Sequence, residues 1–159
     1  MLDAQYFLLY TLGWTILLQL TIPFHELGHF LAIKQFGGQI YSVELTSGKP
    51  MFKHGKFSIG MKFWAGKVSW DETSIKSNTK TALVAFAGPL TDWILSILIF
   101  SISFFLYTIN LLSYSSFVFL FIFSILQFLN SIFEMIPNKK KKNDGYNFLI
   151  RLNLIRKVS

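Results

Sequence analysis

Residues 14–33 read WTILLQLTIPFHELGHFLAI, an apolar stretch that contains three ionisable side chains close together. His25, Glu26 and His29 fall within five positions, whereas residues 4–24 carry no charge. An apolar helix of about 28 residues is long enough to cross a hydrocarbon core ~30 Å thick. Ionisable residues inside a membrane span are costly and are functional by default. The stretch therefore predicts a membrane-spanning helix, over about 5–33, that carries a functional site.

The composition of the whole chain also favours a membrane protein. Of its 159 residues, 52% are apolar, 18 are Phe and 14% are charged, whereas soluble domains carry roughly 25% charged residues. Cysteine is absent, so we expect neither disulfides nor thiolate metal ligands. The net charge of +7 does not indicate nucleic-acid binding, because the basic residues flank apolar stretches and no nucleic-acid motif accompanies them.

Two further membrane spans are predicted from the second half of the chain. Residues 93–133 form a run of 41 without a charge. A single helix of that length would be about 60 Å long, twice the thickness of the hydrocarbon core. The run therefore holds two crossings, over about 81–109 and about 117–136. Residues 145–157 mix apolar and basic side chains, which is typical of an amphipathic helix at the membrane interface.

The segment between the first two spans has the pattern of a small sheet. Phe57, Ile59, Met61 and Phe63 alternate with small or polar residues, which is the periodicity of a strand. Turn signals stand at Gly48-Lys49-Pro50 and His54-Gly55. The predicted fold is a single membrane domain over 1–159. It has an all-α core of three transmembrane helices, a small antiparallel β-sheet over about 38–72 on the cytoplasmic side, and a C-terminal interfacial helix.

The spacing of His25 and His29 predicts a zinc site. Residues four apart share one face of a helix, so both imidazoles can bind one Zn²⁺, and Glu26 can act as a base on a water molecule there. Zinc needs a third protein ligand and an open position. The candidates are His54, Asp71, Glu72, Asp92, Glu134 and Asp144. His54, Asp71 and Glu72 fit turns or surface positions better. The residue pattern does not decide which of Asp92, Glu134 and Asp144 is the third ligand.

Three segments occur in the chain in a characteristic order. They are His25-Glu26-Leu27-Gly28-His29 within a span, Ala87-Gly88-Pro89-Leu90 at the start of the next, and Ile136-Pro137 followed by Asp144-Gly145. Together they resemble the site-two protease family of intramembrane zinc metallopeptidases in its minimal form, which lacks a PDZ domain.

The resemblance implies one Zn²⁺ per chain bound by His25, His29 and Asp144, with Glu26 as the catalytic base. It implies a zinc endopeptidase that hydrolyses a peptide bond in or near a transmembrane segment. The expected partners are a membrane-protein or membrane-bound peptide substrate and the lipid bilayer.

The chain departs from the family pattern at three places. Asp92 and Glu134 stand where the family often has Asn, and Asn130 lies one helical turn before Glu134. The gap from Pro137 to Asp144 is longer than usual and holds four lysines, which we expect to loop outward.

The two acidic departures leave an alternative open, a catalytically inactive family member that acts as a membrane interaction or immunity protein. A membrane metal-binding or transport component is a further alternative. The presence of Glu26 argues against both, because a binder needs no base beside a metal ligand.

The way a substrate is held can also be anticipated. A helical peptide bond has paired backbone groups, so a transmembrane substrate must unwind locally, and unpaired backbone in a bilayer is costly. We expect the alternating segment 56–63 to offer a strand edge to which an extended substrate adds. A plain hairpin at the membrane surface is the alternative interpretation of that segment.

The distribution of charge predicts the membrane topology. All 15 Lys and Arg residues lie in segments 34–80 and 139–157. Two crossings separate these segments, so they share a side, which the positive-inside rule makes cytoplasmic. The chain is expected to be a multi-pass protein of the cell membrane with its N-terminus outside and its C-terminus in the cytoplasm. The first span lacks a preceding basic region, so we expect it to be retained rather than cleaved.

This topology can be tested by cysteine labelling, because the chain has no cysteine of its own. A cysteine at Ser113 should react with an impermeant reagent from outside intact cells, and a cysteine at Lys56 only after the cells are opened. Reaction of position 56 in intact cells would refute the topology.

Overall fold

The structure is a computed structural model that describes residues 4–62 and 65–154. Its helices are α1 (Ala4–Gln35), α2 (Asn78–Thr108), α3 (Tyr114–Met135) and the short α4 (Asp144–Arg151). The first three are long and apolar enough to cross a membrane, so the three predicted apolar helices are confirmed.

The helix boundaries follow from local side-chain chemistry. Ser77 caps α2 by accepting a hydrogen bond from the backbone N–H of Lys80, and Ser113 caps α3 in the same way through the N–H of Ser116. Such caps satisfy backbone donors that the first helical turn leaves unpaired. Just after α2, Asn110 takes a left-handed conformation with φ of 58°, a conformation that Asn tolerates better than most residues. The turn between the two helices is therefore short.

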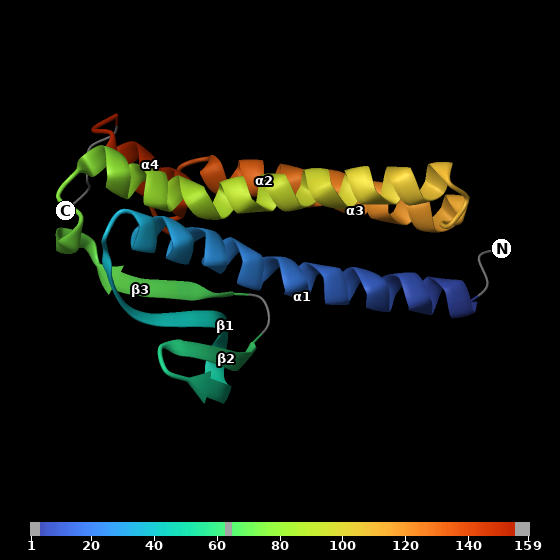
Figure 1. Ribbon diagram of the computed structural model, residues 1–159, viewed down its shortest axis with the longest axis horizontal. Helices are drawn as coiled ribbons and strands as arrows, with labels where there is room; N and C mark the ends of the chain where they lie inside the picture. Colours follow the sequence, from blue (N-terminus) through green and yellow to red (C-terminus); the bar gives the residue numbers. More distant parts are fainter. Residues whose placement is uncertain (1–3, 63–64, 155–159) are drawn as a thin grey trace.

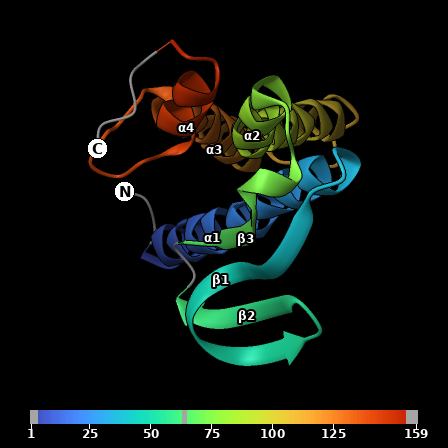
Figure 2. The same cartoon turned by 90° about the vertical axis from the view of Figure 1, so that its left-hand side faces the viewer.

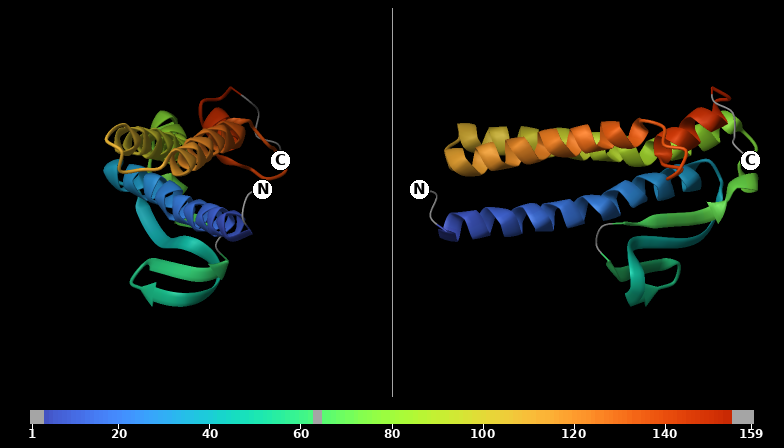
Figure 3. Two further views of the ribbon diagram at one scale, coloured as in Figure 1. Left: turned by 90° about the vertical axis from the view of Figure 1, so that its right-hand side faces the viewer. Right: turned by 180° about the vertical axis from the view of Figure 1, so that it is seen from behind.

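The molecule is built in three layers (Figures 1 and 2). Helices α2 and α3 lie side by side in one layer, α1 forms the middle layer, and the sheet covers the opposite side of α1. The sheet and α4 lie toward one end of the bundle, whereas the start of α1 and the α2–α3 turn lie at the other (Figure 3). The two basic segments of the chain thus share one end.

The sheet has three strands, β1 (Gln39–His54), β2 (Phe57–Lys62) and β3 (Lys67–Asp71), in the order β2-β1-β3. β1 and β3 are antiparallel, as predicted. The pairing of β1 with β2 is more complex, because β1 bends at Gly48, where φ is +94°. Consequently the predicted turn at residues 48–50 is a bend inside one strand, whereas the predicted turn at His54-Gly55 joins β1 to β2.

The bend lets β1 pair with β2 twice. Ile59, for example, is in register with Thr46 on the first arm of β1 and with Phe52 on the second. The first arm runs parallel to β2, and the second forms an antiparallel hairpin with it. The fully antiparallel sheet that the sequence suggested therefore has one parallel pairing. The predicted strand residue Phe63 lies outside the described residues.

An apolar core holds the sheet against the helices. Its buried members come from the end of α1, from β1, from the segment before α2 and from α2 itself. They are Ile33, Ile40, Val43, Ile75 and Val84. Burying such side chains contributes about 1.5–3 kcal/mol each. Ile33 lies one helical turn after His29, and the carbonyl of Val84 accepts from His29, so this core fixes the position of the sheet relative to the histidines.

The C-terminal helix is shorter than the predicted 145–157. α4 ends at Arg151, and Asn153 takes a left-handed conformation with φ of 58°. Residues 155–157 lie outside the described part of the chain. α4 packs on α2, where the rings of Phe148 and Phe86 lie 5.7 Å apart.

The structure distinguishes buried Phe residues from exposed ones, which gives a stability prediction. Phe123 is fully buried and meets Trp14 edge-on at 5.3 Å, whereas Phe133 is 65% exposed. Phe123→Ala should lower the free energy of unfolding by about 3–5 kcal/mol because it leaves a cavity. Phe133→Ala should change it by less than about 0.5 kcal/mol. Thermal unfolding in detergent measures both, and equal losses would contradict the assignment.

Candidate metal centre

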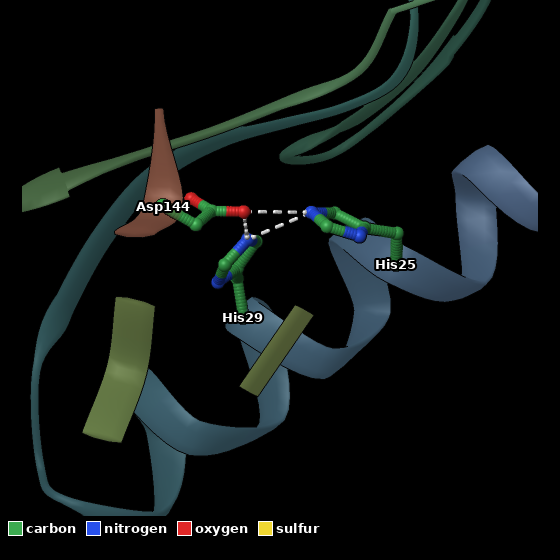
Figure 4. A group of neighbouring side chains, drawn as sticks. All are labelled: His25, His29 and Asp144. Atoms are coloured by element: carbon green, nitrogen blue, oxygen red, sulfur yellow. Dashed lines mark hydrogen bonds and ion pairs between the residues drawn. The ribbon is translucent and has the colours of Figure 1, made fainter. Parts of the chain in front are cut away.

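The two histidines project from one face of α1 toward the same point (Figure 4). Their Nε2 atoms are 3.2 Å apart, as expected for residues one helical turn apart. Both side chains are mostly shielded from solvent, with 13–14% of their surface exposed.

Asp144, at the start of α4, completes a triangle with the histidines (Figure 4). Its Oδ2 atom lies 3.1 Å from Nε2 of His25 and 3.4 Å from Nε2 of His29. Burial alone would raise the pKa of Asp144, but its interactions with the two neighbouring histidines hold it well below its usual value. The carboxyl group is therefore ionised at neutral pH.

Asn143 explains how Asp144 reaches this position after a lysine-rich loop. Its side-chain amide donates to the carbonyl oxygens of Glu134 and Ile136, both at 2.8 Å. Its Oδ1 atom accepts from the backbone N–H groups of Asn138 and Tyr146. One side chain thus closes the loop onto the end of α3 and caps α4. The loop's lysines are exposed, as predicted.

The other ring nitrogen of each histidine is held by α2. Nδ1 of His25 lies 2.7 Å from Oδ2 of Asp92, and Nδ1 of His29 lies 2.7 Å from the carbonyl oxygen of Val84. A carbonyl oxygen and a carboxylate can only accept hydrogen bonds. The contacts with Val84 and with the Asp92 carboxylate therefore assign a hydrogen atom to Nδ1 of each histidine. In the neutral imidazoles, the Nε2 atoms, which face each other and the Asp144 carboxylate, then carry no hydrogen.

This arrangement fits a metal ion. Three acceptor atoms at 3.1–3.4 Å repel one another unless a proton or a metal ion lies between them. Zn–N and Zn–O bonds of about 2.0–2.1 Å at tetrahedral angles place neighbouring donor atoms about 3.3–3.4 Å apart. The spacing of the three atoms therefore matches tetrahedral zinc. In addition, the second ring nitrogen of each histidine is hydrogen-bonded, as is usual for histidines that bind a metal.

The remaining acidic candidates occupy different places. Asp92 and Glu134 approach Nδ1 of His25, at 2.7 and 3.8 Å, and not the Nε2 atoms that face Asp144. The three residues also form a second group whose ligand atoms lie within 4.8 Å of one another. In that group, however, Nδ1 of His25 already donates to Asp92.

The three surface candidates lie in other local structures. His54 is exposed at the tip of the hairpin. Asp71 caps a 3-10 turn, η1 (Glu72–Ser74), through the N–H of Thr73. Glu72 forms an ion pair with Arg151 of α4.

Close packing at glycine residues brings the histidines to this point. A Cβ atom on Gly88 would overlap Nε2 of both histidines, lying 2.5 Å from that of His25. A Cβ atom on Gly28 would lie 2.5 Å from the carbonyl oxygen of Ala87, so Gly28 lets α1 and α2 approach closely. The histidine rings fit against α2 only because residue 88 has no side chain.

Glu26 lies beneath the beginning of β3. It is only 8% exposed, and a Cβ atom on Gly66 would lie 2.8 Å from its Oε1 atom. Glu26, both histidines and Asp144 line one cavity of about 1030 Å³, together with Val68 and Trp70 of β3 and with Asn130 of α3. The carboxylate is therefore next to both the metal centre and the backbone of an edge strand.

The sequence did not single out Val84, Gly66 or Asn143. Val84 accepts a hydrogen bond from His29 through its carbonyl oxygen, which any residue provides. Gly66 matters because it has no side chain, since a Cβ atom there would overlap Glu26. Asn143 carried a signal, because an Asn directly before Asp-Gly and an amphipathic stretch is a helix N-cap pattern.

Comparison with known proteins identifies the family of the chain. Residues 13–152 match peptidase family M50, the family of the site-two proteases, whose members are membrane metallopeptidases and in general depend on zinc. No curated protein matches the chain. Among the described residues, the three-stranded sheet and η1 are the elements between α1 and α2, and no PDZ domain was found. Because the match covers most of the sequence, this membrane protein belongs to peptidase family M50.

Proposed function

We propose that this protein is an intramembrane zinc endopeptidase that cleaves a membrane-anchored substrate in or near its transmembrane segment. His25, His29 and Asp144 bind one Zn²⁺, and Glu26 is the catalytic base. One observation carries the proposal: the three donor atoms lie at the mutual distances that tetrahedral zinc requires, while Glu26 lines the same cavity.

The residues divide the chemistry among them. Bound zinc supplies Lewis acidity that polarises a scissile carbonyl and makes a water molecule acidic. Glu26 accepts a proton from the attacking water and later gives it to the leaving amine. Asp92 and the Val84 carbonyl keep the two imidazoles in the orientation and tautomer that leave Nε2 available.

The substrate adds as a strand to β3 in this proposal, not to segment 56–63. β2 cannot accept a substrate at residues 57–59, because the two arms of β1 pair with it there, one on each side. β3 pairs with β1 alone among the described strands, and Val68 and Trp70 line the cavity. The substrate-binding strand differs from the expected one because β1 bends at Gly48. The bend places β2, the expected edge strand, between the two arms of β1.

The backbone of Val68 is the group most suited to bind a substrate strand. The N–H of Val43 donates to the carbonyl of Lys56 and so points away from β3. Val43 is in register with Val68, and an antiparallel pair whose backbone groups point outward is a non-hydrogen-bonded pair. The N–H and C=O of Val68 therefore face the open edge, where an extended peptide can bond to them.

The inactive alternative is favoured by one observation. Asp92 and Glu134 bring two further carboxylates beside His25, close to where negative charge develops during hydrolysis. Asn130 lines the same cavity one helical turn before Glu134 and offers a neutral amide donor for that charge. The following experiment separates the two functions.

Glu26→Gln should abolish cleavage while preserving the metal site. Wild-type protein in neutral detergent should hydrolyse a model transmembrane peptide, and the variant should be slower by about 10²–10⁴-fold, the usual contribution of a general base. Zinc content and substrate copurification should be unchanged. If zinc-loaded wild-type protein binds the peptide without cleaving it, the chain is an inactive family member.

Zinc content tests the ligand set. Metal analysis should find one zinc per wild-type chain and much less after Asp144→Ala, because a ligand is lost. Asp92→Ala should lower zinc affinity by roughly 10–100-fold, the usual effect of removing a partner of a ligating histidine. Glu134→Ala is the matched control and should keep its zinc. Full zinc in the Asp144 variant, with loss in the Glu134 variant, would reassign the third ligand.

A proline at position 68 tests the strand edge. Val68→Pro removes an outward N–H without removing a bond between β3 and β1, so cleavage should fall while zinc content and thermal stability persist. Ser69→Pro is the control, because residue 69 faces β1, and it should destabilise the protein. Normal cleavage by a folded Val68 variant would rule out substrate addition to β3.

A further inference from the structure

Three lysines form a cationic rim around the cavity of the metal centre. Lys67 begins β3, while Lys141 and Lys142 belong to the loop before α4, and all three line the cavity and are exposed. Lys139 and Lys140 are part of the same four-lysine run and are equally exposed, but they do not line the cavity. The run is therefore divided into a pair that faces the cavity and a pair that does not.

The charges of the rim are not neutralised within the described residues. Within residues 4–62 and 65–154, one ion pair joins a Lys or Arg side chain to a carboxylate. It is Arg151–Glu72, and it involves none of the three lysines. Three acids of the cavity, Asp92, Glu134 and Asp144, lie against His25 rather than against a lysine. The three lysines are therefore available to bind a ligand that carries negative charge.

The rim surrounds the place where the proposed reaction occurs. Lys67 stands between Gly66, which lies over Glu26, and Val68, whose backbone faces the open edge of β3. Lys142 lies two positions before Asp144. An extended peptide advances about 3.3 Å per residue. A chain bound along β3 therefore passes the rim within a few residues of the bond above Glu26.

We propose that this rim, Lys67, Lys141 and Lys142, selects substrates that carry acidic side chains within a few residues of the cleaved bond. The inference rests on the proposed function, and it adds the chemical class of the substrate. The competing role for lysines near a span is binding of anionic lipid headgroups. Two observations favour a peptide: Lys67 lies on the sheet rather than beside a span, and it shares one cavity with only half of the lysine run.

Matched charge variants and matched peptides test this selection. The peptides share one transmembrane segment and differ in the flanking residues, Asp and Glu in one and Asn and Gln in the other. Cleavage is measured in neutral detergent without anionic lipid, and binding is measured with Glu26→Gln protein. Lys141→Glu/Lys142→Glu is compared with Lys139→Glu/Lys140→Glu, which changes the net charge equally, and Lys67→Gln is examined separately.

Wild-type protein should prefer the acidic peptide by about three- to tenfold at low salt, as expected for a few partly exposed ion pairs. The Lys141/Lys142 variant should lose this preference, Lys67→Gln should reduce it, and the Lys139/Lys140 variant should keep it. Cleavage of the neutral peptide should remain as in wild type.

Three results would overturn the inference. They are equal handling of both peptides by wild-type protein, equal loss in the two double variants, and a preference that exists only in vesicles with anionic lipid. A different result, cleavage of neither peptide by zinc-loaded protein, would refute the proposed function and not the inference. Binding to the Glu26→Gln protein then still decides the inference, because it requires no catalysis.

Discussion

Two imidazole nitrogens and a carboxylate oxygen face one another at 3.1–3.4 Å within a bundle of largely apolar helices. Such a cluster of donor atoms can hold a metal ion, and the rest of the structure is arranged to keep it in place. α1 supplies both histidines from one face, and α2 fixes their outer nitrogens through Asp92 and the Val84 carbonyl. The absence of a side chain at Gly88 lets the rings reach α2 at all.

The sheet acts on the same centre from the other side. The bend of β1 encloses β2 between its two arms and leaves β3 as the strand with an open edge beside the cavity. The core that includes Ile33 and Val84 fixes this sheet against α1 and α2. Backbone groups able to bind an extended peptide are therefore held at a defined distance from Glu26. In an apolar environment this matters, because an unwound substrate needs partners for its own backbone.

The charges around the site form two zones. Carboxylates gather at the floor, where Asp92 and Glu134 approach His25, and lysines surround the opening. The carboxylates lie against the histidines, and the lysines line the opening of the same cavity. Acidic residues at these two positions depart from the pattern that the resemblance led us to expect. They are compatible with metal binding, because they approach the ring nitrogen of His25 that is turned away from Asp144.

The sequence by itself determined the elements of the fold and the core of the site. Apolar runs between basic segments specify three long helices, since few other structures tolerate such runs, and the i, i+4 spacing of His25 and His29 places both rings on one face. The third donor was open on the residues alone. It depends on a hydrogen-bonded loop closed by Asn143, which brings Asp144 to residues more than 100 positions earlier. The identity of the open strand edge also lay beyond the sequence, because alternation predicts a strand but not which neighbours pair with it. Only the tertiary structure decided these two points, since both arise from contacts between segments that are distant along the chain.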